Sequence, residues 1–97
     1  MNKNIKKLIE YPKEGILSKE VLGNKFNVSL FCMAKNSRIG KHTSTKSGIV
    51  YVLEGKGIFS LDKEEIKMAP GTFIFMEKNA VHSLIAEENT SFLLILT

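Results

Sequence analysis

The sequence has little of several residue types that often mark a specific function. Among its 97 residues are no tryptophan, one cysteine, two prolines and two histidines. A single cysteine cannot form an intramolecular disulfide. This residue, Cys32, lies in the apolar run 30–33, and we expect it to be buried as a small hydrophobic side chain.

The chain also lacks long apolar runs and clustered charge. Apolar stretches such as residues 92–96 are about a strand long, far below the roughly 20 residues that span a membrane. The first lysines are not followed by an apolar segment and a cleavage site, so the cytoplasm is the expected location and no membrane partner is expected. The net charge of +4 comes from thirteen lysines and one arginine spread along the chain, which predicts no nucleic-acid partner.

What is present is the composition of a globular protein, with 43% hydrophobic and 25% charged residues. A chain of this length forms one domain near the small end of what a single apolar core stabilises, so we expect a homodimer. We expect residues 1–12 to form an N-terminal arm or first strand and residues 13–97 to form a β-barrel. Ile5, Leu8 and Ile9 share a helical face, but Pro12 ends that pattern within two turns.

Apolar residues alternate with polar ones in short runs, which is the period of a β-strand. Turn residues separate these runs every eight to twelve positions or so, a rhythm typical of a sandwich or barrel. The pattern predicts nine strands, over residues 15–22, 26–34, 41–46, 49–54, 57–62, 64–68, 72–76, 81–86 and 90–96. The last of these is apolar on both faces, and we expect it to be covered, for instance by a second subunit.

Two segments resemble the paired motifs of the cupin superfamily. In the first, His42 is followed by the run Tyr51-Val52-Leu53-Glu54-Gly55-Lys56-Gly57. In the second, Gly71 opens a strand and His82 follows eleven positions later. The resemblance covers about half of the chain. It implies an all-β, single-domain, cupin-type double-stranded β-helix, that is, a jelly-roll barrel.

The resemblance also implies a metal site, but the ligand set departs from the family pattern. Ser44 stands where the second histidine of the first motif would be, and Gly48 stands where its glutamate would be. The metal ligands carried over are therefore His42 and His82 alone, whereas a divalent ion prefers three or more protein ligands. Cys32 would add a thiolate if its side chain faced the barrel interior.

Two hypotheses for the function stay open, and neither identifies a catalytic residue. In the first, the barrel binds a small polar ligand, a sugar or a small acid, in a pocket lined by His42, Ser44, Val50 and His82. The alternative is a metal-dependent isomerase, epimerase or lyase, as in similar cupins that act on sugars and small acids. Its cofactor would be Mn, Fe, Ni or Zn, and a site without metal carries equal weight.

Carboxylates are expected to play no part in the site. Glu54 and Glu77 are interpreted as solvent-facing turn residues, and Asp62, the only aspartate, as part of a hairpin turn. A hydrolase with a serine nucleophile is disfavoured, because neither Ser44 nor Ser83 lies in a nucleophile elbow and no aspartate is placed to orient a histidine.

Overall fold

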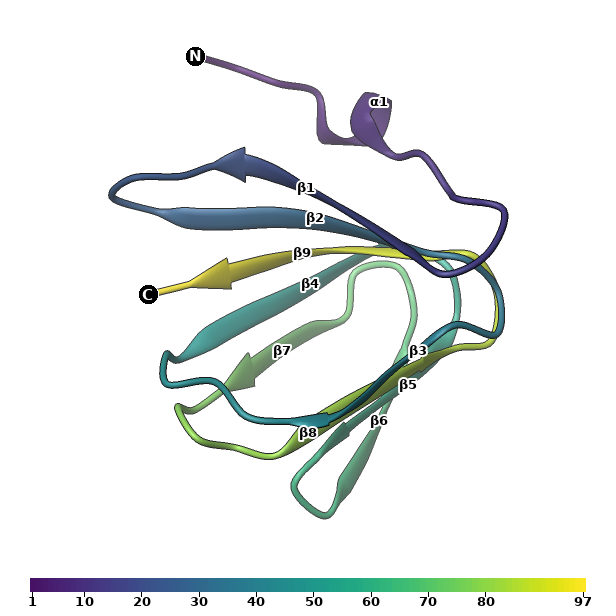
Figure 1. The fold of residues 1–97 in the computed structure, drawn as a ribbon, viewed down its shortest axis with the longest axis vertical. Coiled ribbons are helices and arrows are strands. Elements are labelled where there is room, and N and C mark those ends of the chain that lie inside the picture. Colours follow the sequence, from purple (N-terminus) through teal and green to yellow (C-terminus); the bar gives the residue numbers. More distant parts are fainter.

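The computed structural model describes residues 1–97, which fold almost entirely as strands in two antiparallel sheets (Figure 1). No helix in it has the length and apolarity needed to cross a membrane. The elements are α1 (Ile5–Leu8), β1 (Ile16–Leu22), β2 (Asn27–Met33), β3 (Arg38–His42), β4 (Gly48–Glu54), β5 (Gly57–Leu61), β6 (Glu64–Met68), β7 (Phe73–Met76), β8 (His82–Ala86) and β9 (Thr90–Leu96).

One sheet has five strands in the order β1-β2-β9-β4-β7, and the other has four in the order β3-β8-β5-β6. From β3 onward the chain passes repeatedly from one sheet to the other, so the two sheets are built together. The pairings within both sheets are antiparallel. This is the jelly-roll barrel that the cupin resemblance implies, and the predicted fold class is confirmed.

The sequence pattern locates eight of the nine strands to within one residue at each end. The exception is the strand predicted over 41–46, which is wrong: β3 ends at His42, and residues 43–47 form a loop. In this loop the Ser44 hydroxyl accepts the backbone N–H of Lys46, a local contact that competes with strand pairing. The Ser44 carbonyl also accepts the backbone N–H of Asn79 and so ties the loop to the β7–β8 connection.

The C-terminal strand β9 is not an edge strand but the middle strand of the five-stranded sheet, paired with β2 on one side and β4 on the other. Its Phe92 faces the barrel interior and stacks on Phe31 of β2, with ring centroids 5.1 Å apart. The main core lies between the two sheets and consists of Met33, Val50, Val52, Phe59, Met68, Ile74, Met76, Leu84, Ala86 and Phe92.

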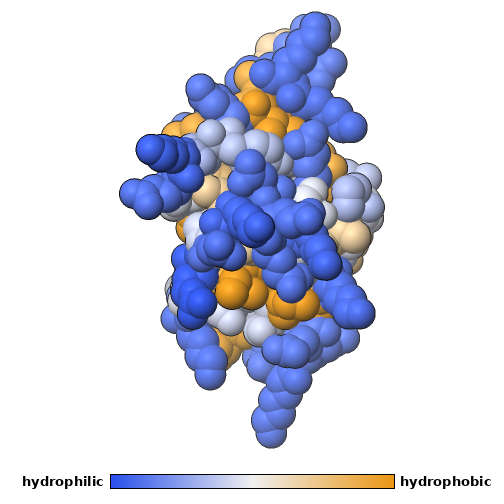
Figure 2. All heavy atoms as spheres, turned by 90° about the vertical axis from the view of Figure 1, so that its right-hand side faces the viewer, coloured by the Kyte–Doolittle hydropathy of each residue, from blue (hydrophilic) through white to orange (hydrophobic).

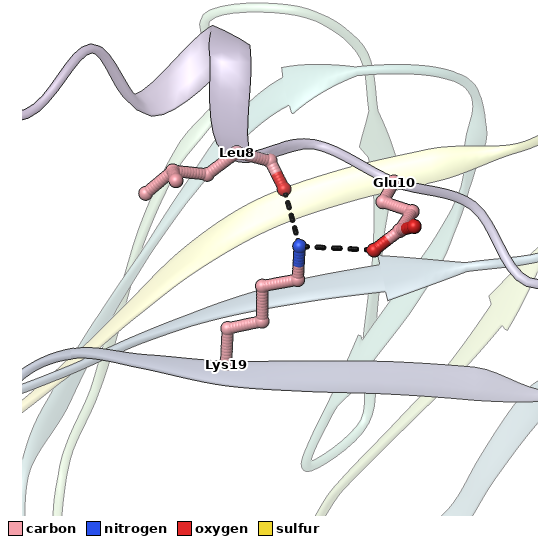
Figure 3. Close-up of polar contacts among 3 residues, drawn as sticks. All are labelled: Leu8, Glu10 and Lys19. Atoms are coloured by element: carbon pink, nitrogen blue, oxygen red, sulfur yellow. Dashed lines mark hydrogen bonds and ion pairs between the residues drawn. The ribbon is translucent and has the colours of Figure 1, made fainter.

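The N-terminal arm lies against the outer face of the five-stranded sheet (Figure 1). It contains the four-residue helix α1, so the helical spacing of its apolar residues does form a single turn. The Lys19 ammonium of β1 holds the arm by donating to the Leu8 carbonyl at 3.0 Å and to the Glu10 carboxylate at 3.1 Å (Figure 3). Leu30 and Cys32 are fully buried yet lie outside the main core, which confirms the expected burial of the cysteine.

Candidate ligand-binding site

The two histidines of the chain lie side by side on neighbouring strands. His42 ends β3 and His82 begins β8, and their Cα atoms are paired in the register of these strands. Their ring centroids are 3.9 Å apart, with the ring planes tilted by 60°. Antiparallel pairing thus brings together two imidazoles that lie forty positions apart in the sequence.

Each imidazole makes the same hydrogen bond to the backbone two residues before it. The Nδ1 atom of His42 lies 2.8 Å from the Gly40 carbonyl oxygen, and the Nδ1 atom of His82 lies 3.0 Å from that of Ala80. A carbonyl oxygen can only accept, so both Nδ1 atoms carry a proton. In the neutral rings both Nε2 atoms therefore keep a free lone pair and act as acceptors.

His82 sits in an environment that keeps its ring uncharged. Its side chain is only 7% exposed and stacks on Phe59, with centroids 5.9 Å apart and planes 4° from parallel. Burial lowers the pKa of His82 below its usual value near 6.5, and the neighbouring His42 lowers it further. The Ala80 carbonyl and Asp62 act in the opposite direction on this pKa without reversing its shift.

The two rings form part of the wall of a cavity of about 130 Å³ between the sheets. Eight of its ten lining residues are apolar, and the histidines supply the only polar side chains. No carboxylate, ammonium, guanidinium or hydroxyl group lines it. The lining residues are Phe31, Ile39, His42, Val50, Phe59, Met76, His82, Leu84, Phe92 and Leu94.

Three of the four residues predicted for the pocket, His42, Val50 and His82, line this cavity. Ser44 does not: it lies in the loop after β3, where its hydroxyl binds the Lys46 backbone. The other aromatic and aliphatic lining residues were not predicted from the sequence, because inward-facing strand residues have the same period whether they fill a core or border a cavity.

The residues present do not fit a divalent metal centre. No group of three or more His, Cys, Asp and Glu side chains is placed to hold a metal ion. Cys32 cannot complete the set, because Phe31 lines the cavity and the next residue of a strand points to the opposite face. The donor set of the cavity is thus two neutral imidazole nitrogens without a carboxylate, short of the usual three ligands.

The carboxylates lie away from the cavity. Asp62 occupies a turn with φ of 53° and accepts the backbone N–H of Val81, and Glu77 is exposed, as expected. Glu54 differs from expectation, since it is half-buried and accepts a hydrogen bond from the Tyr11 hydroxyl at 2.8 Å. Its environment could not be predicted locally, because its partner comes from the N-terminal arm.

The sequence of the chain matches the model of a known protein family. A family model described as a cupin domain matches residues 29–97. Among curated proteins, none has a sequence that matches this chain.

Solved structures share the fold over most of the chain. A conserved protein of unknown function from Streptococcus pyogenes is 23% identical, with a TM-score of 0.89 over 100% of this chain and 86% of that one. An RmlC-like cupin from Desulfovibrio desulfuricans is 17% identical, with a TM-score of 0.88 over 100% and 95% of the two chains. A predicted oxalate decarboxylase from Thermotoga maritima is 20% identical, with a TM-score of 0.77 over 84% and 78%. At these identities the likeness establishes the fold alone.

Proposed function

The chain belongs to the cupin superfamily, and on that basis we propose that it binds a small molecule in the cavity between its sheets, with His42 and His82 as the polar contacts. The observation that carries this proposal is the pair of imidazoles in the lining of an otherwise apolar cavity, each with its Nδ1 atom bonded to the backbone and its Nε2 atom without a partner in the chain. Small-molecule sites in proteins combine an apolar lining with a few convergent polar atoms in the same way.

The accessibility of the lone pairs favours a binding site over a closed core. No buried side-chain nitrogen or oxygen lacks a hydrogen-bond partner. The Nε2 atom of His82 has no protein partner, so part of its surface must be free of protein contact although the residue is almost fully buried. A ligand with a hydrogen-bond donor would satisfy this acceptor while filling the apolar space.

The lining gives little support to the expectation of a sugar or a small acid. A sugar needs a partner for each hydroxyl that it buries, and the cavity offers two acceptors. A carboxylate needs a cation or several N–H donors, and the lining contains neither in the neutral state of the histidines. The metal-dependent isomerase, epimerase or lyase remains the second hypothesis, but the donor set supports no step through a metal.

The proposal is tested by screening uncharged and charged fragments with ¹H–¹⁵N NMR while observing the two imidazoles. Binding in the cavity should shift the Nε2 resonances of both histidines. His82→Phe, which keeps a ring stacked on Phe59 but removes the acceptor, should weaken binding about fivefold or more. The control is Ser60→Ala, on the groove outside the four-stranded sheet, which should leave binding unchanged. A screen in which no fragment perturbs the imidazoles contradicts the proposal.

We further propose that two copies of the chain associate through the outer face of the five-stranded sheet. On β7 the side chains of Phe73 and Phe75 point away from the barrel and are 63% and 53% exposed. Strand pairing places Tyr51 beside Phe73 and Ile49 beside Phe75, and it continues both rows onto β9. The resulting outer patch consists of Ile49, Tyr51, Phe73, Phe75, Leu93 and Ile95, and none of its side chains carries a charge.

The total surface of the chain is larger than that of a typical folded monomer of its mass. Its accessible area is 6292 Å², whereas a folded monomer of 10.9 kDa is expected to expose about 5,600 Å². The excess is close to the roughly 800 Å² that each partner buries in a standard interface. The side of the molecule seen in Figure 2, which lies on the right in Figure 1, is mostly hydrophilic, with only small separate hydrophobic areas. An apolar patch is complementary to itself across a two-fold axis, whereas charged faces of two +4 chains repel.

A further inference from the structure

We infer that the cavity takes a small phenol, a neutral six-membered aromatic ring whose hydroxyl donates to the Nε2 atom of His82, the buried histidine of the pair. This inference rests on the proposed binding function and names the chemical class of the ligand. It follows from the polarity of the two histidines, the volume of the cavity and the aromatic rings that line it.

The polarity of the site favours a hydrogen-bond donor. Both Nδ1–H groups donate to backbone carbonyls, those of Gly40 and Ala80. The remaining nitrogen of each neutral ring, Nε2, is therefore an acceptor only. A ligand oxygen without a proton would meet two lone pairs and no donor. A carboxylate would in addition lose its hydration against an apolar wall. A neutral hydroxyl supplies the proton and brings no charge into the cavity.

The volume and the walls favour an aromatic ring. A cavity of about 130 Å³ is slightly smaller than the roughly 150 Å³ apolar cavity that holds benzene. Two parallel aromatic pairs border it: Phe31 with Phe92, and Phe59 with His82. A flat ring can pack against such faces, whereas a saturated ring of several hydroxyls would leave polar groups against them.

A hydroxyl has one proton and donates to one imidazole, so the buried His82 is the acceptor and the Nε2 atom of the exposed His42 is left to water. The ring centroids of His42 and His82 are 3.9 Å apart, each Nδ1 atom is bonded to the backbone, and both residues line the cavity. His82 is buried and His42 is exposed, so the pair connects the interior with the surface. The ring then lies inside, and the hydroxyl lies toward the side where the histidines meet solvent.

The test compares four probes, phenol, toluene, benzoate and glucose, by calorimetry and by the imidazole ¹⁵N resonances of the full chain at neutral pH. Toluene has the shape of phenol without a donor, benzoate adds a negative charge, and glucose is a sugar. We expect phenol to bind about five- to tenfold more tightly than toluene, the effect of one hydrogen bond. Benzoate and glucose should not shift the imidazole signals.

Two variants distinguish the contribution of the hydrogen bond to phenol binding from that of the cavity shape. His82→Phe should remove the preference for phenol over toluene while toluene still binds, and Ser60→Ala should keep the preference. If His82→Phe fails to fold, as judged by circular dichroism, the comparison of phenol with toluene in the wild-type chain still decides the question. Equal binding of these two probes overturns the inference.

The outcomes also distinguish this inference from the proposed function. Benzoate or glucose shifting the imidazole signals more than phenol would overturn the phenol class and leave a ligand-binding barrel in place. If none of the probes and no fragment of the wider screen reaches the imidazoles, the inference and the proposed function fail together.

Discussion

At the scale of single residues, the environment decides what each side chain can do. His82 and His42 are the same residue type on paired strands, yet one is buried against Phe59 and the other is exposed. Cys32 shows the same principle on β2: it is buried as expected, but on the face opposite to the cavity. A residue type in the right motif position therefore does not by itself define a ligand.

The lowered pKa of His82 predicts how stability changes with pH. In the unfolded chain this imidazole takes up a proton near pH 6.5, whereas in the folded chain burial keeps it neutral to lower pH. The unfolded state thus binds more protons, and the free energy of unfolding should fall as pH decreases from 6.5 toward the folded pKa. For one proton the slope cannot exceed about 1.4 kcal/mol per pH unit.

Urea denaturation of the wild type and of His82→Phe between pH 7.5 and 5.5 measures this effect. The variant should lose less stability than the wild type over that range, since it no longer has the buried imidazole. His42→Phe serves as the comparison at the exposed neighbour. An identical pH dependence in the wild type and His82→Phe would show that protonation of His82 is not linked to unfolding.

At the scale of elements, the N-terminal arm is joined to the sheet by a partly buried polar contact. The Tyr11 hydroxyl lies 2.8 Å from Glu54 and 3.0 Å from the Ser91 hydroxyl. A carboxylate can only accept, so the Tyr11 hydroxyl donates to Glu54. The Ser91 hydroxyl then donates to the Tyr11 oxygen. Burial, together with the hydrogen bond and the charge of Glu54, raises the pKa of Tyr11 to about 12, against the opposing effect of Ser91.

Removal of this hydroxyl in Tyr11→Phe should destabilise the chain by about 1–2 kcal/mol, because the fully buried Ser91 loses its partner. Urea denaturation at pH 7 measures the loss. Ser60→Ala is the control, since Ser60 lies on the other sheet, away from the outer patch, and removal of its half-buried hydroxyl breaks no contact with the arm. A Tyr11→Phe chain as stable as the Ser60→Ala chain would contradict a structural role for the contact.

The same contact predicts an effect at alkaline pH. Unfolded tyrosine loses its proton near pH 10, whereas folded Tyr11 keeps it to about 12. Its stabilising effect is therefore complete below pH 10 and is lost as pH rises from 10 to 12. The difference in stability between the wild type and Tyr11→Phe should narrow over this range.

At the scale of the whole molecule, the barrel has one strongly apolar surface that intramolecular packing leaves open. The outer patch lies on β7 and on the neighbouring parts of β4 and β9. The N-terminal arm lies against β1 through Lys19 and against the Glu54 end of β4 and the Ser91 end of β9 through Tyr11. From its apolar sequence, the C-terminal strand was expected to be covered, for instance by a second subunit. In the structure only the outward side chains of that strand, such as Leu93 and Ile95, remain available to a partner.

If the outer patch joins two copies, the wild type should sediment with twice the 10.9 kDa mass of one chain. Phe73→Ser should raise the dissociation constant at least about tenfold, because an aromatic side chain returns to water. Phe26→Ser is a matched control, since Phe26 is 62% exposed, similar to Phe73 at 63%, but lies in the β1–β2 turn. A wild type that remains monomeric at high concentration, or a dimer lost only in Phe26→Ser, would rule out this interface.

The sequence by itself determined the all-β class, the limits of eight strands and the burial of Cys32. These features depend on local alternation and on turn residues, which act within a few positions. The loop at Ser44 departs from the prediction because the Ser44 hydroxyl accepts the backbone N–H of Lys46, two residues later, which alternation of apolar residues does not reveal. Even there the strand was displaced by a few residues and not lost.

Only the tertiary structure decided the character of the site. The register of β3 and β8 sets His42 beside His82, the backbone carbonyls assign their protons, and the orientation of β2 turns Cys32 away from them. The partner of Glu54 likewise comes from an arm more than forty positions away. These contacts depend on how distant strands pair and which face each presents, because a shift of one residue reverses every side chain of a strand and no local pattern specifies the pairing of strands far apart.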